Sequence, residues 1–212
     1  FLIHKSVFNK WVSIQIEPET DYTLVFQILG VIVLLGFFFI YRHIQLARYN
    51  KLLMKLSITD KLTQIYNRVK LDADLEEFEN LYNRYKQPFA IILIDIDDFK
   101  DINDNFGHQT GDRFLIELSM VLVSASRDSD VIGRWGGEEF MVICPQTNLQ
   151  GAKTVAEKLR KALATHQFDT VGRKTASFGI AAFTDNDSIS ELIRRADNAL
   201  YSAKASGKDR VL

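Results

Sequence analysis

The residues best suited to chemistry are Gly136-Gly137-Glu138-Glu139, which lie between two apolar runs at 131–135 and 140–144. Two strand-like runs joined by a Gly-Gly pair predict a tight β-hairpin, because its turn requires a positive φ that glycine adopts easily. A structural turn needs only the glycines. Two carboxylates directly after them, with no side chain at the tip, form a surface where a metal or phosphate can approach the backbone. This combination indicates nucleotide chemistry.

A second group of acids follows the apolar run at residues 89–94 and consists of Asp95, Asp97, Asp98, Asp101 and Asp104. A solvated acidic loop explains the last four but not Asp95, because an acid at the end of a buried strand is costly unless a cation neutralises it. If the hairpin flanks this strand, Asp95 and Glu138 face each other. Two hard oxygen ligands with open positions are what Mg²⁺ prefers in a nucleotide site.

The residues after these acids have the chemistry of a nucleotide pocket. Lys100 can compensate phosphate charge as a point cation. Asn103 and Asp112 can read the donor edge of a guanine, although Asp112 also suits the positive end of a helix dipole. His108 follows a glycine, and with no second His or Cys nearby it is better explained as a structural loop residue than as a ligand.

Residues 58–212 have the periodicity of an α/β (α+β) domain. Asn67 can cap a helix that runs to about Tyr85, and the apolar run from Phe89 to Asp95 predicts a central strand covered on both faces. A loop follows. We expect further helices at about 111–125, 149–166 and 189–205 and a strand at 175–183. The order predicts a palm-like sheet containing antiparallel strands, with helices on its faces, akin to the split βαβ arrangement.

Residues 22–41 break the globular pattern because they contain no charged residue. At about 1.5 Å per residue this stretch covers the ~30 Å hydrocarbon core of a membrane, with Tyr22 and Tyr41 as interfacial anchors. A buried core helix and a cleaved signal peptide are the alternatives. Basic residues after the stretch place its C-terminal side in the cytoplasm.

The regions on either side of this predicted transmembrane helix complete the domain organisation. Residues 42–57 predict a signalling helix or stalk with an apolar stripe at Leu46, Tyr49, Leu53 and Leu56; a helix resting on lipid headgroups is the alternative. Residues 1–21 are interpreted as the end of an extracytoplasmic sensor region, since residues 8–12 resemble the last helix of periplasmic solute-binding modules; a generic amphipathic segment is the alternative.

The composition argues against two classes of protein, nucleic-acid-binding proteins and proteins built on a disulfide framework. A net charge of −1 gives no case for nucleic-acid binding. The single cysteine, Cys144, excludes a disulfide framework and fits a reducing compartment.

Five segments in register resemble the GGDEF family of diguanylate cyclases: residues 59–63 with 67–68, 95–100 with 103–104, 106–108 with 111–112, 136–140, and 196–204. The resemblance covers roughly residues 58–212. It implies a bacterial enzyme that condenses two GTP into cyclic di-GMP and pyrophosphate as a homodimer. With the predicted transmembrane helix, we expect an enzyme anchored in the inner membrane with its catalytic domain in the cytoplasm. The third motif position is Glu138 rather than aspartate, which still supplies a metal oxygen.

The resemblance also implies a role for individual residues. Asp95, the Ile96 carbonyl and Glu138 bind Mg²⁺, with Mn²⁺ as an alternative, and Glu139 lies beside the attacking hydroxyl as a second acid or a proton acceptor. The residues implied to bind substrate are Lys100, Asn103, His108, Asp112, Gly136, Gly137, Lys204 and Lys208. Lys208 stands where the family commonly has arginine. The positive charge is kept, but the two parallel hydrogen bonds that a guanidinium donates to a phosphate are lost.

Arg127 and Asp130 precede the hairpin as an Arg-x-x-Asp pair, which in this family forms an inhibitory product site. An arginine can donate two hydrogen bonds to a phosphate or stack on a guanine, while the carboxylate accepts hydrogen bonds from the edge of the base. A charged helix-to-strand turn is the plain alternative. Two other functions stay open: a catalytically inactive receptor for cyclic di-GMP, and a cyclase or polymerase-like enzyme acting on another nucleotide.

Overall fold

The computed structural model describes residues 21–56 and 58–212, which belong to two compact units that divide between Met54 and Lys55. The predictions made for residues 1–20, and for the apolar stripe at Tyr49, Leu53 and Leu56, lie outside the described residues and side chains.

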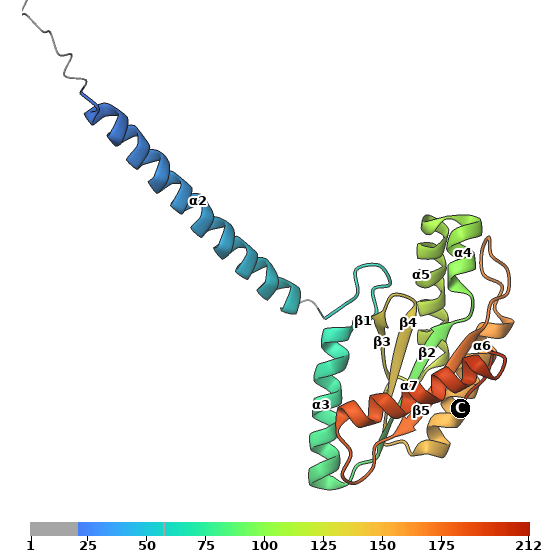
Figure 1. Ribbon diagram of the computed structural model, residues 1–212. Helices are drawn as coiled ribbons and strands as arrows, with labels where there is room; N and C mark the ends of the chain where they lie inside the picture. Colours follow the sequence, from blue (N-terminus) through green and yellow to red (C-terminus); the bar gives the residue numbers. More distant parts are fainter. Residues whose placement is uncertain (1–20, 57) are drawn as a thin grey trace, which may run out of the picture. The chain divides into compact units, whose positions relative to one another are not determined.

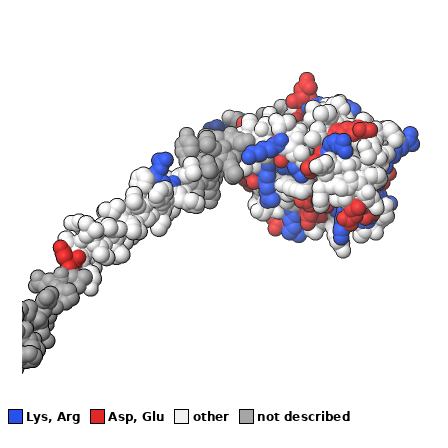
Figure 2. Space-filling model, turned by 90° about the horizontal axis from the view of Figure 1, so that it is seen from above, with Lys and Arg blue, Asp and Glu red and all other residues white. Residues whose placement is uncertain are grey.

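The described part of the first unit consists almost entirely of helix α2, Thr23–Leu56 (Figure 1), whose last two residues fall past the division at Met54. The helix continues without a break from the predicted transmembrane helix into the predicted stalk. Its segment Thr23–Leu46 is long and apolar enough to cross a membrane, with a mean hydropathy of 2.6, and 0% of the apolar window is buried. Figure 2 shows this stretch as an uncharged surface between acidic and basic groups. The helix therefore lacks the burial of a soluble protein's core helix.

The second unit is built on a mixed five-stranded sheet in the order β1-β3-β4-β2-β5. The strands are β1 (Tyr66–Asn67), β2 (Phe89–Ile96), β3 (Val131–Gly136), β4 (Glu139–Pro145) and β5 (Ala176–Ala182). β2 is antiparallel to both β4 and β5, and all eight of its residues are buried. Its continuous apolar sequence is explained by this burial on both faces.

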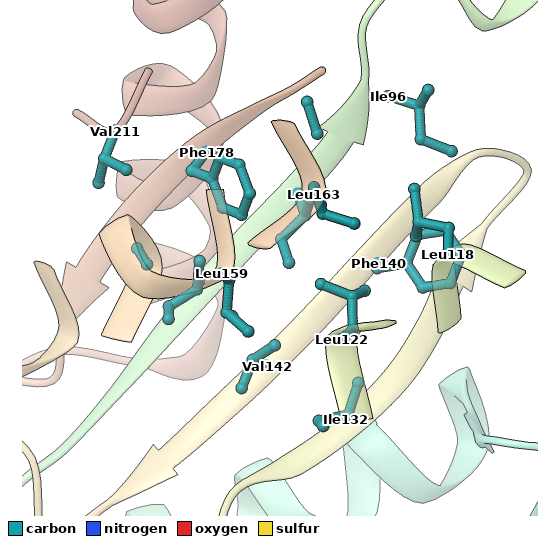
Figure 3. Close-up of a cluster of buried hydrophobic side chains, with 14 of the residues drawn as sticks. Ile96, Leu118, Leu122, Ile132, Phe140, Val142, Leu159, Leu163, Phe178 and Val211 are labelled. Carbon is teal, nitrogen blue, oxygen red and sulfur yellow. The ribbon is translucent and has the colours of Figure 1, made fainter. Parts of the chain in front are cut away.

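Helices cover both faces of the sheet (Figure 1). They are α3 (Arg68–Tyr85), α4 (Phe99–Phe106), α5 (His108–Ala125), α6 (Leu149–Thr165) and α7 (Ile189–Ala205). The side chains of Ile92 and Ile94 join one core cluster with α4, α5 and α6, and part of that cluster is shown in Figure 3. Ile91 and Leu93 join a second cluster with α3 and α7. Alternate residues of β2 therefore serve opposite layers.

Local signals explain where the helices begin and how closely they pack. Asn67 caps α3, as predicted, by accepting a hydrogen bond from the Lys70 N–H at 3.1 Å. α7 lies so close to β5 that a Cβ on Gly179 would stand 2.1 Å from the carbonyl oxygen of Ala196. Only glycine allows this approach.

Several predictions of local structure were wrong. The expected loop after β2 contains the helix α4, and α5 begins at His108 rather than near Gly111. The two-residue strand β1, parallel to β3, was not predicted. In the hairpin only Gly137 has a positive φ, of 49°, while Gly136 ends β3. Glu138 occupies the second turn position, so the tip does carry a side chain.

Candidate active site

Asp95 and Glu139 form a cross-strand pair at one end of the sheet, where β2 and β4 lie side by side. Residues in register on antiparallel strands project from the same face, and two residues back along β2, Leu93 packs with α3 and α7. Both carboxylates therefore belong to the α3/α7 face. Asp95 is 8% exposed. The hairpin flanks the central strand as predicted, but the acid directly opposite Asp95 is Glu139 rather than Glu138.

The cation that neutralises Asp95 within the chain is Lys204, near the end of α7. Its Nζ lies 2.6 Å from Asp95 Oδ2. Burial nevertheless raises the pKa of Asp95 above its ordinary value, and the nearby Glu138 and Asp97 raise it further against the opposing effect of Lys204. Lys204 therefore does not fully offset the cost of burying the ionised carboxylate.

The pKa of Glu139 is shifted in the same direction as that of Asp95. Partial burial raises the pKa of Glu139, and the charges of Asp95 and Glu138 add to the increase. Within residues 21–56 and 58–212, no three His, Cys, Asp or Glu side chains are grouped as a metal site. The predicted metal set, which is Asp95, Glu138 and the Ile96 carbonyl, nevertheless suits a hard divalent cation, because it offers only oxygen donors and two of them are carboxylates.

Asp97 is buried and serves to hold the site together, which corrects its assignment to a solvated loop. Its carboxylate accepts hydrogen bonds from Thr175 Oγ1 and Ser177 Oγ, both at 2.7 Å, and from the Asp209 N–H at 3.1 Å. It thus joins the end of β2 to β5 and to the C-terminal segment. The hydroxyl residues Thr175, just before β5, and Ser177, within this otherwise apolar strand, were the available signal.

The proposed guanine-reading residues lie at the junction of α4 and α5, on the other face of the sheet. Asn103 lies directly against α5, since a Cβ on Gly111 would stand 2.1 Å from Asn103 Oδ1. Asp112 follows this glycine and is exposed. Lys100 is exposed on α4, and His108, expected in a loop, is the exposed first residue of α5. The structure therefore brings Asn103 close to Asp112.

Lys208 lies in the segment after α7, with a positive φ of 61°. Its Nζ is 2.5 Å from Asp98 Oδ1, and this hydrogen bond raises the pKa of Lys208. Asp98 is the residue between Asp97 and the start of α4. Lys204 and Lys208 thus approach the end of β2 from the same C-terminal segment, while the exposed Gly136 and Gly137 border the site from the hairpin.

Arg127 and Asp130 form a tight turn between α5 and β3. The Arg127 N–H donates to Asp130 Oδ2 at 3.0 Å. The other carboxylate oxygen, Oδ1, is buried and has no hydrogen-bond partner among the described residues. Beside it lies a cleft of about 370 Å³, lined by Gln64, Ile65, Tyr66, Val123, Arg127, Asp128, Asp130 and Ile132.

The family model for the GGDEF domain of diguanylate cyclases matches residues 57–210. The chain belongs to the GGDEF family. It is 40% identical to the diguanylate cyclase DgcM of Escherichia coli over 153 residues, which are 72% of this chain and 37% of DgcM. The chain thus spans little more than a third of the length of this curated relative.

Solved structures of the GGDEF family share the fold. The chain is similar to the diguanylate cyclase SiaD of Pseudomonas aeruginosa, solved with its activator SiaC, with a TM-score of 0.70, 32% identity and coverage of 99% of this chain and 82% of that one. It is equally similar to the GGDEF domain of DgcB from Caulobacter crescentus in complex with c-di-GMP, with a TM-score of 0.70, 30% identity and coverage of 73% and 94%. The predicted fold class is confirmed.

Proposed function

We propose that residues 58–212 form a diguanylate cyclase domain of the GGEEF type that condenses two GTP into cyclic di-GMP and pyrophosphate. The observation that supports this most is the pairing of Asp95 with Glu139 at the end of the sheet, next to Glu138 and the cation Lys204. This arrangement places acids and a lysine where phosphoryl transfer requires them.

The metal site in this proposal consists of Asp95, the Ile96 carbonyl and Glu138. A bound Mg²⁺, or Mn²⁺, would neutralise phosphate charge and polarise the phosphorus under attack. Asp95 and Glu139 are a cross-strand pair of acids, and burial and the neighbouring carboxylates raise the pKa of both. A divalent cation would stabilise their ionised forms, which supports a metal here.

The nucleotide is held on two sides. Asn103 and Asp112 read the guanine edge at the α4–α5 junction, with His108 beside them. Lys100, Lys204 and Lys208 hold the phosphates, and the exposed glycines 136 and 137 let the nucleotide approach the backbone. Lys204 and Lys208 would exchange Asp95 and Asp98 for phosphate oxygens when GTP and metal bind.

The reaction joins two nucleotides held by two subunits. The 3′-hydroxyl oxygen of each GTP bonds to the α-phosphorus of the other. At each α-phosphorus the bond to the oxygen that bridges to the β-phosphate breaks, so two phosphodiester bonds form and two pyrophosphates leave with the bonding electrons. Glu139 accepts the hydroxyl proton. Because one domain binds one GTP, the active unit is a two-fold homodimer with facing sites, and catalysis is chiefly positioning and electrostatics.

The test is incubation of the full chain in detergent micelles with Mg²⁺ and GTP, followed by separation of nucleotides. The proposal expects cyclic di-GMP and pyrophosphate, and a loss of at least about 100-fold in Glu139→Gln, by the scale of a lost proton acceptor. Absence of product from dimeric wild-type protein would overturn it.

The cleft at Arg127 and Asp130 supports product feedback. Arg127 and Asp130 both line it, and the exposed arginine can bind a phosphate. We expect added cyclic di-GMP to inhibit the wild type and to inhibit Arg127→Ala much more weakly, at unchanged initial rates. Equal inhibition of both would rule this site out.

Helix α2 supports a membrane-anchored enzyme of the bacterial inner membrane, with residues 22–41 as the transmembrane helix and 42–57 as a stalk that couples an extracytoplasmic signal to the pairing of two catalytic domains. Chains with and without residues 1–57 should then differ in dimerisation and activity. Equal values for the two would contradict the coupling.

A catalytically inactive receptor for cyclic di-GMP is the second candidate, and the same cleft favours it. It predicts binding of cyclic di-GMP without turnover of GTP. The presence of Asp95, Glu138, Asn103 and Asp112 together favours the enzyme.

A further inference from the structure

A groove of about 440 Å³ lies beside Glu139 on the α3/α7 face of the sheet. The residues that line it include Arg68, Leu93, Trp135, Glu139, Asp197 and Leu200. The guanidinium of Arg68 lies 4.1 Å from the centre of the Trp135 ring and closes one side. The groove thus connects the proposed proton acceptor with the exposed flank of α7.

That flank carries Asp197, Tyr201 and Lys204, which are four and three residues apart and so lie on one side of the helix. Lys204 places the flank at the reaction centre through its contact with Asp95. Asp197 is exposed and has no hydrogen-bond or ion-pair partner within residues 21–56 and 58–212. Tyr201 is 74% exposed, more than any other large hydrophobic or aromatic side chain of the described catalytic unit.

The nucleotide bound by the same subunit does not explain this flank. Its guanine is assigned to α4 and α5, whose buried residues belong to the core cluster on the opposite face from α7. Asp95 and Glu139, however, point to the α7 face. In the proposed reaction, the group that must reach Glu139 is the sugar whose 3′-hydroxyl is deprotonated.

We propose that Asp197 and Tyr201 form a subsite for the ribose of the second GTP, which is carried in by the partner subunit. The 2′-hydroxyl is on the carbon next to the 3′-hydroxyl, so a carboxylate bordering the same groove as Glu139 accepts its hydrogen bond. The ring of Tyr201 packs against the sugar. The inference rests on the proposed function and adds to it the discrimination of ribose from deoxyribose.

The first experiment compares turnover of GTP with turnover of 2′-deoxy-GTP by the full chain in micelles. A hydrogen bond to a charged group is worth roughly 10- to 100-fold, so the wild type should prefer GTP by that factor and Asp197→Asn should show a ratio near one. Tyr201→Ala should lose rate with both nucleotides and Tyr201→Phe should keep it. The matched controls are Tyr85→Ala, an exposed tyrosine of α3, and Glu76→Gln, an exposed acid of the same helix.

The second experiment assigns the ribose to a subunit without relying on turnover. Binding of the unreactive 3′-deoxy-GTP and 2′,3′-dideoxy-GTP is compared at protein concentrations below and above that of dimerisation. The partner's ribose predicts discrimination only in the dimer, and discrimination by the monomer would overturn the assignment.

The outcomes separate the two proposals. An unchanged ratio in Asp197→Asn overturns this inference and leaves the cyclase intact. No product from either nucleotide with the wild type overturns the proposed function and the inference together.

Discussion

Replacing Lys204 with methionine removes the ammonium group that lies 2.6 Å from Asp95, and keeps most of the length of the side chain. Asp95 is 8% exposed, so its carboxylate would be left in the protein with no direct cation. Breaking a fully buried pair costs about 3–5 kcal/mol. Because the Lys204 side chain is 38% exposed, we expect a smaller loss, of about 1–2 kcal/mol.

The loss of stability in Lys204→Met should depend on pH, and it should be larger at high pH than at low pH. The pKa of Asp95 is already raised by burial, and Lys204 opposes that increase. Without the lysine the pKa rises further, so folding is penalised wherever the carboxylate is ionised. The difference from the wild type should be complete at pH 8 and shrink toward zero as the pH falls toward the unfolded value of about 3.9.

The assay is urea unfolding of the full chain in micelles at pH 8 and at pH 4.5, followed by circular dichroism. Added Mg²⁺ should raise the free energy of unfolding more in Lys204→Met than in the wild type, because the metal ion then neutralises Asp95 in place of the lysine. Lys208→Met is the matched control, since its ion pair with Asp98 is solvent-exposed. An equal loss in both variants, or a loss independent of pH, would refute the reasoning.

Three further predictions concern the scaffold. Cys144 is buried with its pKa raised to about 12, so about one thiol in 10⁴ is ionised at pH 8 and an aromatic disulfide reagent should react only after unfolding; fast reaction of the native chain would contradict this. Gly179→Ala should lose about 2–3 kcal/mol in urea unfolding, because the added methyl group meets the backbone of α7, whereas a neutral result would show that the helix can shift. Asn67→Ala should lose about 1 kcal/mol by removing the cap of α3, with Asn67→Asp, which restores a cap acceptor, as the control.

The elements with strong local signals could be predicted from the sequence. The cap at Asn67, the continuous apolar run of β2 and the amphipathic period of α7 placed these elements within a residue or two of their observed bounds. The short helix α4 was missed although Phe99, Ile102 and Phe106 recur at helical spacing, because the acidic residues between them were interpreted as a loop. β1 was missed because its two residues are held by pairing with β3, which only the tertiary structure supplies.

The same contrast between local sequence signals and tertiary contacts applies to the site. Types and spacing identified Asp95, Glu138 and Glu139, but only the strand register shows that Glu139, and not Glu138, stands opposite Asp95. The burial of Asp97 depends on donors about 80 and 112 positions away along the chain. Spacing along a sequence carries no information on such contacts.

The central claim is that the acids at the end of β2 and β4 form half of a two-nucleotide reaction centre. Its most direct test is nucleotide analysis of the dimeric full chain with Mg²⁺ and GTP, run beside Glu139→Gln. We predict one cyclic di-GMP for every two pyrophosphates from the wild type and at most a hundredth of that rate from the variant. GTP left unchanged by the dimeric wild type, or full turnover by the variant, would contradict the account.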